Sequence, residues 1–261
     1  MRIEFLTQDD PLYVLPFFQE FFEACPTEIE VLQVSSSRAM GKRPRIQLLR
    51  ELLSLYGLAG SLQIGSRIIR AHLLSPMHRR RGAERYDTLA QLCRSYAVPY
   101  AVIASPNAPE CLQSARQRAA DVIISVACPY ILGRPLLSLP PRGCINIHHA
   151  PLPRYKGMMP TFWQMFNGER SVGITIHYMS EKVDEGRALF QDSFEIAPGE
   201  SLDHLIRRSK RYGAQCMVRV LRDLHTGTQQ AVPLNAADGT YFTFPTIEEI
   251  RQFHRRGLRA I

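Results

Sequence analysis

Short apolar segments alternate with amphipathic segments along most of the chain. Residues 1–7 alternate apolar and polar positions before two aspartates, and residues 121–126 form a nearly continuous apolar run. The first pattern predicts a strand whose C-terminal end carries the two carboxylates. The second is typical of a parallel strand buried on both faces. With helical periodicity between such strands, the sequence predicts an α/β protein with a mostly parallel sheet and helices on both faces.

The same periodicities place the other elements, with Ser201 as an expected helix N-cap. Further strands are predicted at 29–34, 99–103, 144–148, 173–179 and 239–245, and helices at 14–22, 46–56, 64–74, 86–96, 109–118, 201–224 and after Thr246.

Residues 38–85 hold most of the positive charge. The chain has a net charge of +8, and this segment has eleven basic against two acidic residues, an excess of nine. Residues 46–56 have the spacing of an amphipathic helix that Gly57 and Gly60 interrupt, and 77–82 are expected to form a basic loop. We expect an inserted helical pair at the sheet edge. It could serve core or oligomer packing, present a solvated basic face or bind an anionic partner, and a membrane-surface helix is the weaker alternative.

Composition narrows the class of protein. Hydrophobic residues make up 45% of the chain and charged residues 21%, as in ordinary globular proteins. No apolar run is long enough to span a membrane, and the N-terminus lacks the features of a signal peptide. Six cysteines without a CxxC pair indicate reduced thiols in a cytoplasmic protein. No glycine-rich loop follows the first strand, which disfavours a dinucleotide-binding role.

The stretch 143–190 carries the candidate chemistry. Alternate residues of a strand share a face, so Asn146 and His148 should point the same way. A second alternating segment at 173–179 leads to Asp184 in a turn. An amide, an imidazole and a carboxylate in one place suit acyl transfer, because the first two can donate to a developing oxyanion. The alternative is a buried histidine that is satisfied by the backbone.

This stretch resembles the folate-dependent formyltransferases, which include glycinamide ribonucleotide, methionyl-tRNA and nucleotide-sugar N-formyltransferases. The motifs that carry the resemblance are Asn146-x-His148, Leu152-Pro153-x-Tyr155-x-Gly157, Pro160, Trp163, Asn167-Gly168-Glu169, Gly173-x-Thr175-x-His177 and Asp184-x-Gly186. A weaker likeness covers most of the chain. It implies a Rossmann-like catalytic domain over 1–195, with the insert at about 38–85, and a C-terminal helix with a short extension at 196–261.

The resemblance implies transfer of a formyl group from 10-formyltetrahydrofolate to a primary amine. Asn146 and His148 would donate to the oxyanion, and Asp184 would pair with His148 and help to relay a proton. The resemblance also implies contacts with the folate on two sides. One side is Tyr130, Ile131 and Leu132, and the other runs from Val183 to Glu185. Without it, 130–132 would be interpreted as a hydrophobic helix start.

Asp9, Asp10 and Thr175 are the candidate substrate-binding residues. The two carboxylates would repel a phosphate, which argues against glycinamide ribonucleotide, but they could bind sugar hydroxyls or an ammonium group. Alternatively, Asp9 caps the following helix and Asp10 is solvated. His149 stands where the family usually has a small residue or proline. A metal site with His148 and His177 is disfavoured, and no metal is expected.

The acceptor stays open at the sequence level. We expect a small-molecule amine, such as a nucleotide-linked amino sugar, and no membrane partner. The basic segment could instead face RNA or the polyglutamate tail of a folate. Methionyl-tRNA formylation without the additional C-terminal domain is the alternative activity. A catalytically silent folate-binding or interaction module is the alternative from another class.

Overall fold

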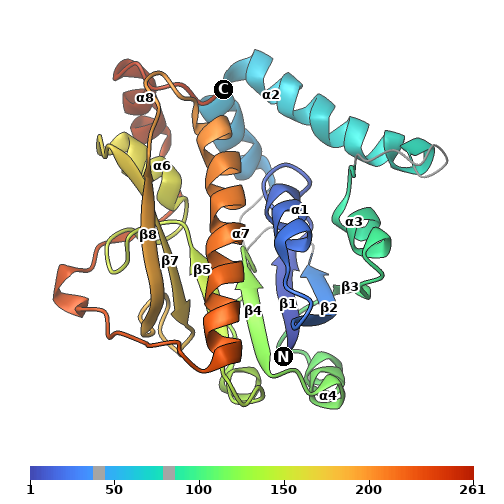
Figure 1. Ribbon diagram of the computed structural model, residues 1–261. Coiled ribbons are helices and arrows are strands. Elements are labelled where there is room, and N and C mark those ends of the chain that lie inside the picture. The colour runs from blue at the N-terminus through green and yellow to red at the C-terminus, as the bar shows by residue number, and fades with distance from the viewer. Residues whose placement is uncertain (38–44, 79–85) are drawn as a thin grey trace.

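The computed structural model describes residues 1–37, 45–78 and 86–261. A seven-stranded sheet with the order β3-β2-β1-β4-β5-β7-β8 forms its centre (Figure 1). The strands are β1 (Arg2–Gln8), β2 (Glu30–Ser37), β3 (Tyr100–Ile103), β4 (Val122–Val126), β5 (Cys144–His148), β7 (Ser171–Tyr178) and β8 (Ala188–Glu195). The strands from β3 to β5 are parallel, and β7 runs antiparallel to both of its neighbours. The predicted α/β class with a mostly parallel sheet is confirmed.

One face of the sheet is covered by α1 (Leu15–Ala24) and α7 (Leu202–Thr226), which pack side by side (Figure 1). The alternation in β1 turns Phe5 toward this face, where its ring lies 4.9 Å from that of Phe21 in α1. Ser201 caps α7 by accepting a hydrogen bond from the backbone of His204, as predicted. The main hydrophobic core lies on this face. Aromatic rings supply much of its buried apolar area.

The opposite face is covered by two shorter helices, α4 (Pro109–Arg118) and α5 (Arg134–Leu137). Glu4 of β1 points to this face and is 2% exposed. Its carboxylate receives two hydrogen bonds from Arg118, at 2.7 and 3.0 Å. A buried carboxylate needs such a partner, so this ion pair fixes α4 against the sheet.

A third cluster lies beyond β7 and joins α6 (Pro160–Phe166) to α8 (Ile247–Arg255). The ring of Phe162 stacks on that of Phe253 at 4.9 Å. Thr246 and Glu249 form a capping box at the start of α8. The two-stranded sheet of β6 (Lys156–Gly157) and β9 (Tyr241–Phe242) borders this cluster. We predicted neither α6 nor β8, while β9 and α8 lie where the sequence placed them.

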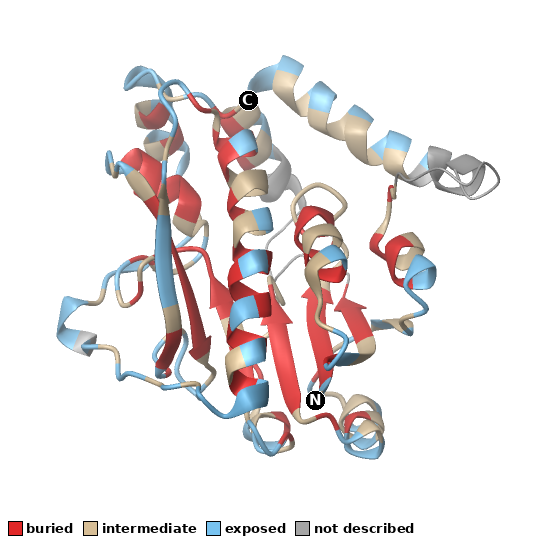
Figure 2. Ribbon diagram, in the orientation of Figure 1, coloured by how far each residue is buried: buried red, intermediate tan, exposed pale blue. Residues whose placement is uncertain are grey.

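The helical insert is one long element, α2 (Arg45–His78), with a break at Gly57, whose φ is 65°. Gly60 stays helical, so the expected second interruption is wrong. Leu55 is buried in the cluster of α6 and α8, whereas the described side chains from 57 to 73 include none that is buried (Figure 2). The outer half of α2 crosses the carboxyl end of the sheet (Figure 1). Part of the expected basic loop, 79–82, lies outside the described residues.

Membrane-spanning helices and metal-binding groups were both sought among the residues that the structure describes. None of its helices combines the length and hydropathy needed to cross a membrane. Its histidine, cysteine and acidic side chains form no group that could hold a metal ion.

Candidate active site

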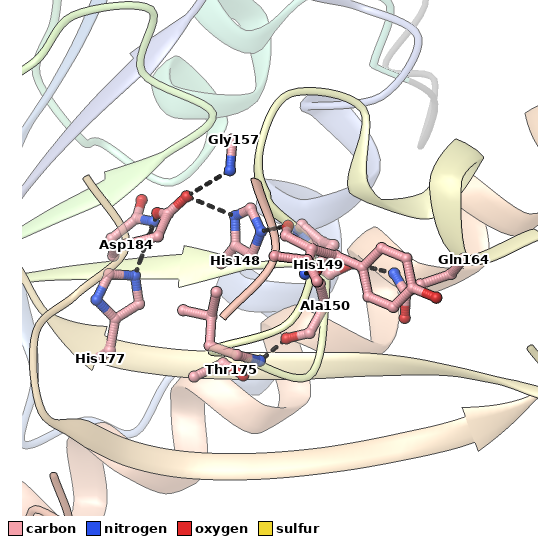
Figure 3. Close-up of polar contacts among 12 residues, drawn as sticks. His148, His149, Ala150, Gly157, Gln164, Thr175, His177 and Asp184 are labelled. Atoms are coloured by element: carbon pink, nitrogen blue, oxygen red, sulfur yellow. Dashed lines mark hydrogen bonds and ion pairs between the residues drawn. The ribbon is translucent and has the colours of Figure 1, made fainter. Parts of the chain in front are cut away.

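Strand β5 and its antiparallel neighbour β7 bring the polar residues of the 143–190 stretch together. Their register places Asn146 opposite His177 and His148 opposite Thr175. The loop after β7 then turns back so that Asp184 lies beside both imidazoles (Figure 3). The structure therefore brings Asn146, His148 and Asp184 to one place, with His177 as a fourth member.

Asp184 lies at the centre of this group. Its Oδ2 is 3.7 Å from Nδ1 of His148, and its Oδ1 is 3.7 Å from Nε2 of His177. The backbone N–H of Gly157 donates to Oδ2 at 2.9 Å. The side chain of Asp184 is 10% exposed, and the hydrogen bond from Gly157 replaces part of its lost hydration.

The backbone around Asp184 requires special residues. Asp184 itself has a φ of 54°, in the left-handed region that aspartate tolerates better than most residues. At Gly186 a Cβ atom would lie 1.6 Å from the carbonyl oxygen of Tyr178. Only glycine lets the turn approach β7 this closely, which accounts for the spacing of the Asp184-x-Gly186 motif.

His177 is held as a neutral imidazole. Its Nδ1 lies 2.9 Å from the carbonyl oxygen of Tyr178 and must therefore carry the proton. Its Nε2 then accepts from the side-chain amide of Asn146 at 3.2 Å. Burial lowers the pKa of His177, and the nearby Asp184 only partly opposes this effect. His177 thus contacts both Asn146 and Asp184.

His148 is buried, with its ring between two acceptors. Its Nε2 donates to the carbonyl oxygen of Tyr155 at 2.7 Å, while its Nδ1 faces Asp184. The backbone contact is the one that the alternative interpretation foresaw. The carboxylate on the other side of the ring is what makes this histidine more than a satisfied core residue.

Thr175 lies behind this group and is fully buried. Its hydroxyl donates to the carbonyl oxygen of Ala150 at 2.7 Å and accepts from the backbone N–H of Leu152 at 3.0 Å. It also accepts from the side chain of Gln191 at 3.1 Å. These bonds hold the loop after β5, so we propose that Thr175 positions this loop.

The two aspartates after β1 differ in their surroundings. Oδ1 of Asp10 accepts hydrogen bonds from the backbone of Leu12 at 2.8 Å and Tyr13 at 3.1 Å, which closes the turn before α1. Burial raises the pKa of Asp10, against the effect of these bonds and of the Lys210 charge. The alternative of an Asp9 cap and a solvated Asp10 is wrong, because α1 has no side-chain cap and Asp10 is bonded within the turn before it.

His149 points away from Asp184 and lies under α7. Its Nδ1 is 2.8 Å from the hydroxyl of Ser209, and its Nε2 is buried with no partner among the described residues. Burial lowers its pKa well below the usual value. The side chain of Gln164 bridges the same loop to β7, because it donates to the His149 carbonyl and accepts from the backbone of Gly173. We did not foresee this bridge, since glutamine in an apolar helix has no distinctive spacing.

Some of the residues predicted to contact a folate are exposed, and the others are held by contacts within the protein. Ile131 is 67% and Val183 40% exposed, although both are apolar. Tyr130 donates to the carbonyl of Ala104, and Leu132 is buried in the core under α5. Glu185 pairs with Lys156 at 2.9 Å. Only the exposed pair is therefore free to offer apolar side-chain area.

Cavities in the described part of the chain include one on each side of the sheet region around β1. One of about 440 Å³ lies between α1, α2 and α7. The other, of about 380 Å³, lies between the sheet and α4. Neither is lined by Asn146, His148 or Asp184.

Comparison with models of known protein families identifies the family of this chain. Residues 72–221, more than half of the chain, match the family model described as formyl transferase. The chain belongs to the formyl transferase family. The matched segment contains Asn146, His148, His177 and Asp184.

Individual relatives agree with this membership. The methionyl-tRNA formyltransferase of Trichlorobacter lovleyi is 34% identical over 137 residues, which are 52% of this chain and 43% of that protein. This formyl transferase thus spans less than half of the length of that relative.

Solved structures share the fold at low identity. The glycinamide ribonucleotide transformylase 1 of Symbiobacterium toebii is 16% identical with a TM-score of 0.61, covering 90% of this chain and 94% of that one. The N-formyltransferase of Helicobacter canadensis, in complex with folinic acid and dTDP-3-aminofucose, is 14% identical with a TM-score of 0.60. The alignment covers 99% of this chain and 83% of that structure.

Proposed function

We propose that this formyl transferase moves a formyl group from 10-formyltetrahydrofolate to a primary amine of a small molecule. The observation that carries the proposal is the position of Asp184, whose carboxylate lies 3.7 Å from the imidazoles of both His148 and His177. Family membership supplies the reaction class, and this group supplies residues able to perform it. We also propose that 1–195 form the catalytic unit and 196–261 a C-terminal part, with α7 completing the core.

The proposed donor, 10-formyltetrahydrofolate, supplies an activated carbonyl carbon whose oxygen becomes negatively charged when an amine adds to it. The described residues fit such a ligand at the apolar positions of Ile131 and Val183, which stay exposed. Burying them under a flat ring system is favoured by the hydrophobic effect. Tyr130 and Leu132 would hold the backbone of this loop in place, while Glu185 would contribute through its backbone.

Asn146 is the permanent hydrogen-bond donor of the site. An amide has two N–H groups, and one of them is used by His177. The second is available for the formyl oxygen. An uncharged amide keeps this capacity at any pH, so Asn146 stabilises negative charge on the oxygen without titrating.

His148 and Asp184 are proposed to handle charge and protons. The Nε2–H of His148 leaves the Tyr155 carbonyl and donates to the formyl oxygen as its charge develops, while Asp184 stabilises the imidazolium. The proton that the amine nitrogen loses passes to this pair, directly or through water. It is then delivered to the folate nitrogen, which takes the electron pair of the breaking carbon–nitrogen bond.

The loop between β1 and α1 bears on which amine accepts the formyl group. The aspartates of the β1–α1 loop provide no phosphate cradle of the glycine-rich kind, which favours an acceptor other than glycinamide ribonucleotide. We propose a small amine, such as a nucleotide-linked amino sugar. Methionyl-tRNA is the second candidate, because relatives that are 34–36% identical carry that name.

An acceptor screen tests the proposal. Purified protein is incubated with formyl-¹³C-labelled 10-formyltetrahydrofolate and a metabolite extract, and labelled products heavier by one carbonyl group are sought by mass spectrometry. We expect a labelled amide that His148→Ala forms about 100- to 1,000-fold more slowly. His225→Ala, at the exposed end of α7, is the matched control and should be as active as wild type. Absence of any labelled product from extract or tRNA would favour the silent binding module instead.

A further inference from the structure

The larger cavity, of about 440 Å³, has a strongly basic wall. It is lined by Arg67 and Arg70 of α2, by Arg207 and Arg211 of α7, and by residues 11–12 of the loop between β1 and α1. The cavity therefore lies at the carboxyl end of the sheet, where ligands bind in open α/β folds. Its volume is within the range of about 300–1,000 Å³ that is typical of small-molecule sites.

A buried carboxylate fixes two of these arginines. Asp203, in the first turn of α7, has a side chain that is only 3% exposed. It accepts hydrogen bonds from Arg67 at 3.0 Å, from Arg207 at 2.6 Å and from the hydroxyl of Tyr13 at 3.1 Å. This network ties the outer half of α2 to α7 and orients two guanidinium groups at the cavity. The site is thus preorganised rather than a chance gathering of surface charges.

The other two arginines differ from this pair in their surroundings. Arg70 and Arg211 are exposed, and no hydrogen bond or ion pair of either is found among the described residues. The four arginines carry four positive charges, and Asp87 in the wall and Asp203 behind it carry two negative charges. The balance is an excess of two positive charges around a cavity, which attracts a ligand with two or more negative charges.

We infer that this arginine-lined cavity binds the phosphate groups of a small diphosphate-bearing ligand. Guanidinium groups match phosphate oxygens in paired hydrogen bonds, and four of them converge on one concave space. A long polyanion would require charges spread along an open surface. Arg67 and Arg70 precede residue 72, where the family match begins, so family membership assigns nothing to them.

The ligand is the acceptor amine, and this clause rests on the proposed function. Helix α7 joins the cavity to the site, because Ser209, between Arg207 and Arg211, contacts His149 at 2.8 Å. His149 directly follows His148. The residues of the cavity and of the site are thus carried by one rigid helix. A sugar attached to a nucleoside diphosphate combines the two phosphate groups with a position for the amine.

Calorimetric titration of the full chain with pyrophosphate and with uridine diphosphate tests the cavity itself. We expect both probes to bind. Arg70→Ala and Arg211→Ala should each weaken binding by about tenfold or more, because each removes a charge-assisted hydrogen bond. Arg222→Ala, an exposed arginine of the same helix, should leave binding unchanged. Since no bond of Arg70 or Arg211 is found among the described residues, neither variant is expected to lower the melting temperature.

These experiments test ligand binding in the cavity separately from formyl transfer. His148→Ala should bind pyrophosphate as well as wild type does, so failure of formyl transfer would not affect the cavity result. If the acceptor is anchored here, Arg211→Ala raises its KM and leaves kcat nearly unchanged. Absent diphosphate binding, or binding that both arginine variants retain, would overturn the inference. It would also be overturned if tRNA bound through these arginines with a steep salt dependence while the diphosphates did not bind.

Discussion

Oδ2 of Asp184 lies 3.7 Å from Nδ1 of His148, and both side chains are at least nine-tenths buried. The two residues are far apart in sequence and meet because β5 and β7 pair antiparallel and the turn after β7 folds back. A carboxylate and an imidazole in this position are matched in charge only when the imidazole is protonated. The pair therefore places a carboxylate beside the imidazole that we propose as a donor to the developing oxyanion.

Gly186→Ala should damage the site through the backbone. The added Cβ would lie 1.6 Å from the carbonyl oxygen of Tyr178, and no side-chain rotation can relieve this contact. The turn must move, and Asp184 moves with it. We expect a loss of about 1–3 kcal/mol in the free energy of unfolding together with lower turnover. Denaturant titration and the transfer assay measure the two effects.

Gly199→Ala provides the comparison for this variant. A Cβ there meets nothing within 4 Å, although the φ of 70° makes any side chain strained. It should lose some stability and keep its turnover. Equal turnover in Gly186→Ala and wild type would show that the Asp184 turn tolerates displacement.

The ion pair of Glu4 and Arg118 should show strong coupling. Arg118→Ala leaves a carboxylate with 2% exposure and only a 3.5 Å contact from the Ser35 hydroxyl, which should cost about 3–5 kcal/mol of unfolding free energy. The double variant Glu4→Leu, Arg118→Leu removes both charges. It should be destabilised less than Arg118→Ala, because apolar replacements of a buried pair are often nearly neutral. Denaturant unfolding of wild type, Glu4→Leu, Arg118→Leu and the double variant gives the coupling energy, and additive effects would contradict the account.

Stability should fall as the pH drops below about 6.5, the usual pKa of histidine. Burial lowers the pKa of His149 and of His177 in the folded chain. The unfolded chain then binds more protons than the folded one, so acid favours unfolding. For each such histidine the loss approaches about 1.4 kcal/mol per pH unit once the pH is below 6.5.

His149→Gln should make this dependence shallower by up to about that amount. Denaturant titrations at pH 5.5, 6.5 and 7.5 measure the slope, and His225→Gln at the exposed end of α7 is the control. Because Asp10 titrates in both proteins, its raised pKa cancels in the comparison. An unchanged slope in His149→Gln would mean that His149 is not held neutral in the folded chain.

Much of the fold could be predicted because its elements have strong periodicity. The apolar run of β4 and the stripe of α7 point to single structures, and the capped start of α8 is equally clear. Helix α6 escaped prediction because all of its residues except the first are buried, so it has no polar face to reveal its period. Strand β8 lost its alternation to a run of exposed residues in its second half.

The residues of the site could be predicted from motifs, but the contacts between them could not. The resemblance singled out Asn146, His148 and Asp184, whereas the hydrogen bond between Asn146 and His177 depends on the register of β5 and β7. Nor could the sequence show that Asp203 would join Arg67 to Arg207, since those arginines lie on different helices. Long-range pairings of this kind are properties of the assembled core.

The most direct test of the central claim compares Asp184→Asn with wild type for transfer of a ¹³C-formyl group from labelled 10-formyltetrahydrofolate, with folinic acid affinity measured in parallel. The substitution keeps the shape of the side chain and removes the charge that faces His148 and His177. We predict that folinic acid affinity stays within about threefold, while the rate of label transfer falls about 100-fold or more. Wild-type transfer by a folded Asp184→Asn protein would contradict the role of this carboxylate and, with it, the proposed reaction.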